Sequence, residues 1–123
     1  MNGEQVEKTE AIKLAKRYFA LSNEKNLAEI RKLFTSSSTY SSANTGVYLG
    51  VDEIMAMQAG FFDRFESMLW EIHRIDEVKT GVVLFEFTFR GKTHDGEEVI
   101  QPGQEYVIIY AGKLQHVEVR NKE

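Results

Sequence analysis

The 123-residue chain contains no cysteine, so it has no disulfide framework, no thiolate nucleophile and no cysteine-ligated metal site. It also lacks an apolar run approaching the roughly 20 residues that a membrane-spanning helix requires. The N-terminal stretch Met1–Glu10 is polar and acidic, whereas a secretory signal needs an apolar segment. We therefore expect a cytoplasmic protein that does not enter a membrane.

A clustered basic surface is missing as well. Lys and Arg number 15 against 19 Asp and Glu, and the formal net charge of -4 argues against nucleic-acid binding. The three histidines, His73, His94 and His116, are scattered, and no pair of them has metal-ligand spacing with a carboxylate beside it. Gly-rich phosphate loops are absent too. We expect neither a metal ion nor another cofactor.

What is present is the composition of a single globular domain, residues 1–123, with 42% hydrophobic and 11% aromatic residues. Apolar residues recur at three- and four-residue steps in Glu4–Ser22, in Leu27–Phe34 and again after Gly50, which predicts three helices. Asn26 with Glu29 resembles a capping box, and Asp52 is the predicted N-cap of the third helix.

After Glu66 the pattern changes to that of strands. Val82–Arg90 is the clearest, because Val83, Phe85, Phe87 and Phe89 alternate with polar residues, and Asp95-Gly96 is a tight-turn signal. The other predicted strands are Thr35–Ser42, Val47–Leu49, Met68–Val78, Val99–Tyr110 and Leu114–Arg120. Helices followed by strands with short turns indicate an α+β fold. We expect three N-terminal helices packed on a strongly curved antiparallel sheet, a cone with an internal pocket.

This order of elements, with Arg17-Tyr18-Phe19, Leu27–Phe34, Gly50–Ile54 and Gly112-Lys113-Leu114, resembles the nuclear transport factor 2-like superfamily. Within it the chain is most similar to SnoaL-like and ketosteroid-isomerase-like proteins. The resemblance covers almost the whole chain and implies a cystatin-like cone. It does not define a function, because this fold hosts isomerases, dehydratases, cyclases, hydrolases, binding domains and assembly modules.

The resemblance to ketosteroid isomerase also assigns roles to positions. It places the tyrosine that donates to the oxyanion at Tyr18, the carboxylate base at Ser42 and the protonated acid of the oxyanion hole at Gln104. Tyr18 and Gln104 are therefore the candidate catalytic donors. Ser42 cannot replace the base, since its hydroxyl holds no negative charge at neutral pH, and Ser36–Ser42 contains no carboxylate. The sequence thus predicts a pocket with donors and without the base for steroid isomerisation.

Strand alternation and this alignment together predict which side chains face the pocket. The expected ligand-binding residues are Tyr18, Tyr40, Phe85, Phe87, Gln104, Val117 and Val119. For Tyr18 and Tyr40 the alternative is a role in core packing alone. Tyr106 would follow Gln104 inward, and Glu105 would face outward. On the last strand, His116 and Glu118 would lie on the outer face, although a one-residue bulge would exchange them with the two valines.

Three functions stay open. The first is a SnoaL-like pocket protein that binds an apolar or aromatic small molecule. The second is an assembly or protein-binding module with a closed pocket, a homodimer that pairs through the convex sheet face. Its support is the set of apolar residues expected on that face, Val82, Leu84, Val107 and Ile109. The third is an isomerase, dehydratase or cyclase that acts on a carbonyl-containing small molecule, so whether the protein is an enzyme is left open.

Overall fold

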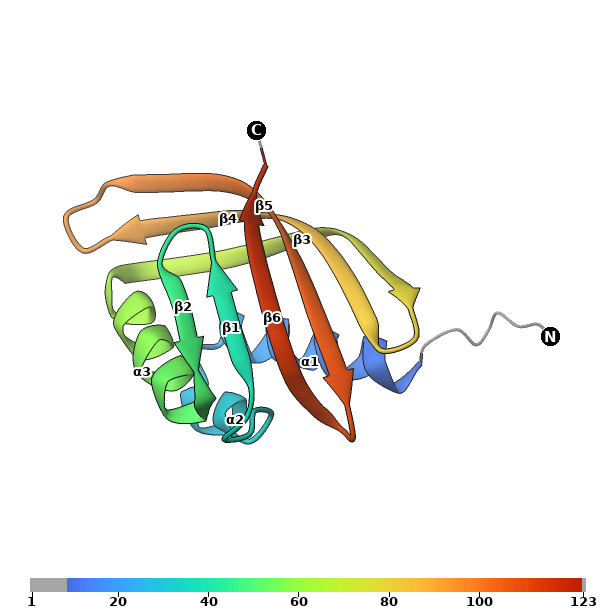
Figure 1. Ribbon diagram of the computed structural model, residues 1–123. Helices are drawn as coiled ribbons and strands as arrows, with labels where there is room; N and C mark the ends of the chain where they lie inside the picture. Colours follow the sequence, from blue (N-terminus) through green and yellow to red (C-terminus); the bar gives the residue numbers. More distant parts are fainter. Residues whose placement is uncertain (1–8, 123) are drawn as a thin grey trace.

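The structure is a computed structural model that describes residues 9–122. Three helices and a short hairpin precede four long strands (Figure 1). In chain order the elements are α1 Glu10–Asn23, α2 Leu27–Arg31, β1 Thr39–Ser42, β2 Gly46–Leu49, α3 Gly50–Asp63, β3 Phe65–Lys79, β4 Val82–Thr93, β5 Glu98–Tyr110 and β6 Lys113–Asn121. The predicted α+β class is confirmed. The part of the first predicted helix before residue 9 lies outside the described residues.

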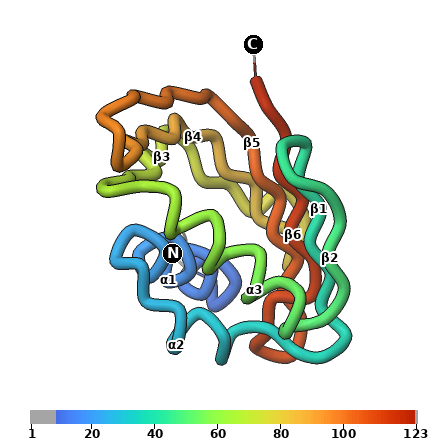
Figure 2. Tube along the Cα trace, turned by 90° about the vertical axis from the view of Figure 1, so that its left-hand side faces the viewer, coloured from blue at the N-terminus to red at the C-terminus, as the bar shows by residue number. Residues whose placement is uncertain are grey.

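All six strands form one sheet in the order β2-β1-β6-β5-β4-β3. The sheet was expected to be antiparallel throughout, but β1 runs parallel to β6, with Tyr40 opposite Val117. The sheet is therefore mixed, which corrects the antiparallel prediction. A parallel pair needs a long crossover, and here β2, α3 and the β3–β5 meander supply it. In Figure 2 the sheet curves around the helices, which occupy its concave side.

Two helix starts differ from the prediction. Asn26 does cap α2, since its side chain accepts from the Glu29 amide at 3.2 Å, but the Glu29 carboxylate pairs with Lys32 at 2.9 Å instead of returning to Asn26. The third helix begins at Gly50 and not after Asp52, because the Leu49 amide is already satisfied by the helix's own Glu53 carboxylate at 2.9 Å. Asp52 is free for an ion pair with Arg31 of α2. No helix within residues 9–122 is long and apolar enough to cross a bilayer.

The hydrophobic core fills one end of the cone. The inner face of α1 and the ends of α2 and α3 pack on the concave face of β4, β5 and β6, and the fully buried residues include Ala15, Ile30, Ile54, Val83, Phe85, Val107, Leu114 and Val117. The ring of Phe19 lies 4.3 Å from that of Phe85, centroid to centroid. Burying each large side chain contributes about 1.5–3 kcal/mol. This end of the cone is solid, so any cavity must lie toward the other end.

A bulge in β6 decides which of its residues belong to that core. The pairing with β5 shifts between Ile108 and Ile109, so that Ile108 lies opposite His116 and Ile109 opposite Leu114. Gln115 is the extra residue. Because of it, Leu114 and Val117 can both point inward although they are three positions apart.

Candidate functional site

A cavity of about 360 Å³ lies between the helices and the concave face of the sheet. This size is within the range of small-molecule sites. Its walls are mainly aromatic and come from α1, α3, β3 and β4, namely Phe19, Phe61, Phe62, Phe65, Trp70, Phe87 and Phe89. The rings pack on one another: the Trp70 and Phe89 centroids are 4.9 Å apart. Polar lining residues fall into a buried group and an exposed rim.

The buried polar group draws one side chain from each of four elements. Tyr18 comes from α1, Tyr40 from β1, Gln58 from α3 and Glu105 from β5. The Gln58 Nε2 donates to the Tyr18 hydroxyl at 2.9 Å. The Tyr18 and Tyr40 hydroxyls also interact with one another, which lowers the pKa of Tyr40 against a larger increase caused by burial. Polar contacts therefore link Gln58, Tyr18 and Tyr40.

Burial controls the protonation of this group. It raises the pKa of both Tyr18 and Tyr40 above the usual range, and the neighbouring Glu105 charge adds to the increase. Both phenols therefore keep their protons at neutral pH. Glu105 is only 3% exposed, and desolvation raises the pKa of its carboxyl to about 8. Among residues 9–122, neither Glu105 Oε2 nor Gln58 Oε1 has a hydrogen-bond partner.

This arrangement can both move a proton and stabilise an oxyanion. A carboxyl group with a pKa near neutrality can accept and return a proton, because neither of its protonation states is strongly favoured at working pH. A partly buried phenol that is itself polarised by a neighbouring hydroxyl, such as that of Tyr40, is a good donor to developing negative charge. Glu105 and Tyr40 thus supply the two elements of enolisation chemistry in one cavity.

The structure brings together four of the seven residues predicted to line the pocket. Tyr18, Tyr40, Phe87 and Val119 line the cavity. Phe85 and Val117 are fully buried in the core and do not line it. Gln104 does not line it either. Glu105, which was expected to face outward, lines the cavity instead. Gly103, two residues earlier on the same face, is the signal in the sequence, because a glycine within a strand indicates close packing on the side to which it points.

The orientation of β5 is the main correction. Gly103, Glu105 and Val107 point inward, with Glu105 opposite Phe85 of β4, so Gln104 and Tyr106 are on the outer face. No carboxylate stands at Ser42, where the resemblance placed the base, but a carboxyl that was expected to face outward, that of Glu105 on β5, lies in the cavity.

The convex face is corrected in the same way. Val107 is fully buried in the core and Ile109 packs against it, so neither belongs to the predicted outer apolar set. Leu84 does lie on the outer face, opposite Tyr106. The apolar part of this face therefore comes from Leu84, Tyr106 and their outward neighbours on β5.

The His–carboxylate pair of β6 lies on the outer face. His116 Nε2 is hydrogen-bonded to Glu118 Oε1 at 3.0 Å, and its Nδ1 to the Thr39 hydroxyl of β1 at 2.7 Å. The bulge at Gln115 precedes these residues and does not turn them inward. The pair therefore cannot act on a molecule inside the cavity.

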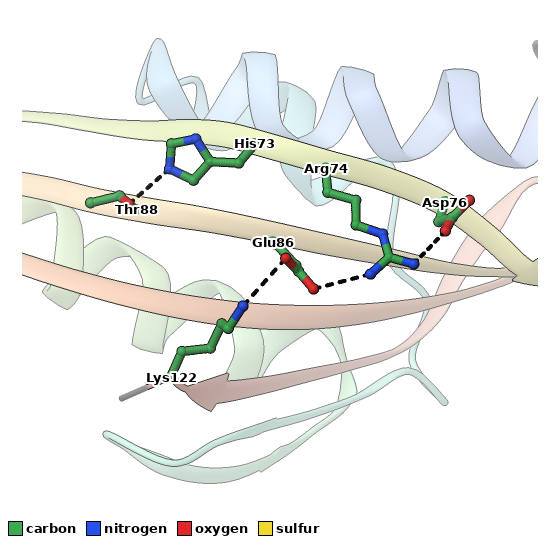
Figure 3. A network of polar contacts seen from close by, with 6 residues as sticks. All are labelled: His73, Arg74, Asp76, Glu86, Thr88 and Lys122. Carbon is green, nitrogen blue, oxygen red and sulfur yellow. Dashed lines mark hydrogen bonds and ion pairs between the residues drawn. The ribbon is translucent and has the colours of Figure 1, made fainter.

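The rest of the convex face carries a solvated network of charges (Figure 3). Glu86 pairs with Arg74 at 3.2 Å and with Lys122 at 3.3 Å, and His73 is hydrogen-bonded to Thr88 at 2.8 Å. Such exposed pairs contribute little each, about 0–1 kcal/mol. Within residues 9–122 no group of three or more His, Asp or Glu could hold a metal ion.

Helices packed against the concave side of a curved six-stranded sheet define the class, an NTF2-like fold. The chain belongs to the SnoaL-like domain family, whose profile matches residues 15–117. No curated protein is significantly similar to it.

Solved structures show the same fold at low identity. An NTF2-like protein of unknown function from Exiguobacterium sp. 255-15 is 19% identical over 89% of this chain and 98% of its own, with a TM-score of 0.77. TerC, co-crystallized with polyporic acid, is 13% identical over 93% and 92%, with a TM-score of 0.80. A hypothetical protein with a ketosteroid isomerase-like fold from Catenulispora acidiphila DSM 44928, in complex with trimethylamine, is 15% identical over 86% and 82%, with a TM-score of 0.77.

Proposed function

We propose that the protein binds a small apolar or aromatic molecule with a carbonyl group and transfers a proton within it. The observation that carries this proposal is the buried Glu105 carboxyl beside the Tyr18–Tyr40 hydroxyl pair in an aromatic cavity. An isomerase, dehydratase or cyclase of carbonyl compounds would use such a site. The SnoaL-like family supports a small-molecule pocket, and TerC shows that a protein of this fold was crystallised with an organic acid.

The reaction begins with ionised Glu105. Its carboxylate takes a proton from the carbon next to the substrate carbonyl. The electron pair of the broken C–H bond forms the C=C bond of the enolate, and the π pair of the carbonyl moves to its oxygen. The Tyr40 hydroxyl donates to the oxyanion that forms, while Tyr18 and Gln58 hold that hydroxyl in place and polarise it. Protonated Glu105 then returns the proton to the same or another carbon of the enolate, which restores the starting charge.

Solvent exchange at an enolisable carbon tests this step without knowledge of the natural substrate. A panel of aromatic ketones is incubated with the protein in D₂O, and deuterium incorporation next to the carbonyl is followed by NMR. We expect Glu105→Gln to lower the exchange rate about 100-fold or more. Glu98→Gln, an exposed carboxylate at the start of the same strand, is the matched control and should change nothing. A Glu105→Gln rate within about twofold of wild type would contradict the role of Glu105 as the base.

A specific observation also favours a homodimer, which is compatible with the pocket function. The convex sheet face exposes large apolar side chains on β2 and β5: Leu49 is 61% exposed, Ile108 37% and Tyr110 77%. By register, Leu49 and Ile108 lie on this face together with Leu84 and Tyr106. Exposed apolar sheet surface of this kind is typical of a protein interface. We propose that two copies pair through this face, leaving both cavities open.

A further inference from the structure

Arg64 is one of only two charged residues among those that line the cavity, the other being Glu105. It follows directly after the last residue of α3, on the exposed rim. Its guanidinium carbon lies 5.7 Å from the ring centroid of Phe61 and 5.1 Å from that of Phe65. Both rings are part of the cavity wall. These cation–π contacts hold the exposed guanidinium beside the aromatic mouth of the cavity.

The guanidinium has no carboxylate partner within the part of the chain that the structure describes. Arg17, Arg31, Arg74 and Arg90 each form an ion pair with an Asp or Glu. A position at the end of a helix explains a cation there, through the helix dipole, but not its placement over two rings of the cavity wall. The planar N–H groups of Arg64 are available to a ligand, and their geometry matches that of a carboxylate.

The remaining rim is neutral. Asn44 of the β1–β2 turn and Asn121 at the end of β6 hold one another by two reciprocal amide hydrogen bonds of 3.0 Å each. Thr45 and Gln101 add only uncharged groups. Desolvation keeps Glu105 mainly protonated at pH 7, since it raises the pKa of the carboxyl to about 8. The lining of the cavity therefore carries positive charge in a chain whose formal net charge is -4.

We propose that the cavity is specific for an aromatic acid, whose rings lie against the aromatic walls and whose carboxylate binds Arg64 at the rim. This inference rests on the proposed function only in requiring that the cavity bind a small molecule. It adds an anionic group to the carbonyl compound proposed above. The acid end stays at the mouth, which leaves the rest of the molecule to reach toward the buried polar group.

The test compares cinnamate with cinnamamide, two probes of nearly equal shape that differ in charge. Affinities are measured by isothermal titration calorimetry at pH 7. Trp70, the only tryptophan, lines the cavity, so a change in its fluorescence verifies that the probe enters. We expect cinnamate to bind wild type at least tenfold more tightly than cinnamamide. Arg64→Gln should reduce this ratio to about one, whereas Arg90→Gln, which removes an outer-face cation paired with Glu71, should preserve it.

The outcomes separate the two proposals. If cinnamamide binds as tightly as cinnamate, the preference for an acid is wrong and the small-molecule pocket stands. A preference that survives in Arg64→Gln would overturn the assignment of Arg64. If neither probe binds at millimolar concentration, or Trp70 fluorescence does not respond to either, both the aromatic-acid inference and the pocket function are contradicted.

Discussion

Replacing Glu105 by glutamine should stabilise the folded protein increasingly as the pH rises. Glutamine has nearly the same shape as a protonated glutamic acid, so it fits the same place without a charge to bury. In the wild type, burial raises the pKa of Glu105 from 4.5 to about 8. The folded state therefore holds a proton that the unfolded chain has already lost over this pH range.

The sign and size follow from that difference. The pKa of Glu105 is higher in the folded than in the unfolded state, so binding of its proton stabilises the folded wild type. This stabilisation is complete below about pH 4.5 and is lost as the pH rises to about 8. The whole difference corresponds to about 5 kcal/mol, at roughly 1.4 kcal/mol per pH unit. Between pH 5 and pH 8 we expect the unfolding free energy of the wild type to fall by about 3–4 kcal/mol relative to that of Glu105→Gln.

Urea unfolding at half-unit pH steps, followed by Trp70 fluorescence, measures this difference. The comparison with Glu98→Gln separates the buried carboxyl from exposed ones, since Glu98 is exposed on the same strand. Its unfolding free energy should follow that of the wild type across the whole range. A Glu105→Gln curve parallel to the wild-type curve between pH 5 and pH 8 would refute the reasoning, because Glu105 would then ionise as easily in the folded as in the unfolded state.

Two further predictions concern shape and assembly. Gly103→Ala should destabilise the protein by about 1–3 kcal/mol in urea unfolding, because the new Cβ would lie 2.6 Å from the Phe87 ring. The control is Gly60→Ala on α3, where a Cβ would have no neighbouring atom within 4 Å. This substitution should be neutral or stabilise the protein by up to about 1 kcal/mol. Equal effects of the two would contradict the inward orientation of Gly103. Light scattering at micromolar concentration should give a dimer mass for the wild type and a monomer mass for Ile108→Glu. Val78→Glu, on the edge strand β3, is the control and should remain a dimer. A monomeric wild type would rule the dimer out.

Local periodicity predicted most of the fold. The apolar stripe that includes Ala15 and Phe19 specifies α1, and the alternation around Phe87 specifies β4, because each pattern has only one regular structure that buries it on one side. The parallel pairing of β1 with β6 had no comparable signal. It joins segments that are 77 residues apart, and a four-residue strand such as Thr39–Ser42 carries too little pattern to specify its neighbour.

The candidate site depended on a register that local patterns leave open. If Asp95-Gly96 formed a two-residue hairpin turn, His94 would pair with Glu97. Counting along the two strands from that pair places Gln104 opposite Phe87. Residues directly opposite one another in an antiparallel pair share a face, so Gln104 would point inward, as the sequence analysis expected.

The structure has a three-residue loop instead. The Thr93 amide donates to the Glu97 carbonyl at 2.9 Å, and the Gly96 amide donates back to the Thr93 carbonyl at 2.9 Å. Gly96 has a φ of +88°, which suits the left-handed residue that ends a loop of this length. The single extra loop residue shifts β5 by one position, and such a shift exchanges its two faces. Glu105 thereby comes to lie opposite Phe85, on the cavity side.

One residue of the sequence does distinguish the two registers. Gly103 lies opposite Phe87, and a side chain at this position would collide with that ring. In the two-residue register this glycine would face solvent, where nothing requires the absence of a side chain. Glycine weakens a strand unless close packing demands it, so Gly103 favours the inward orientation and, with it, an inward carboxyl at position 105. The register that makes room for the Phe87 ring is the same one that brings Glu105 into the cavity, so packing and the proposed chemistry depend on the same one-residue choice.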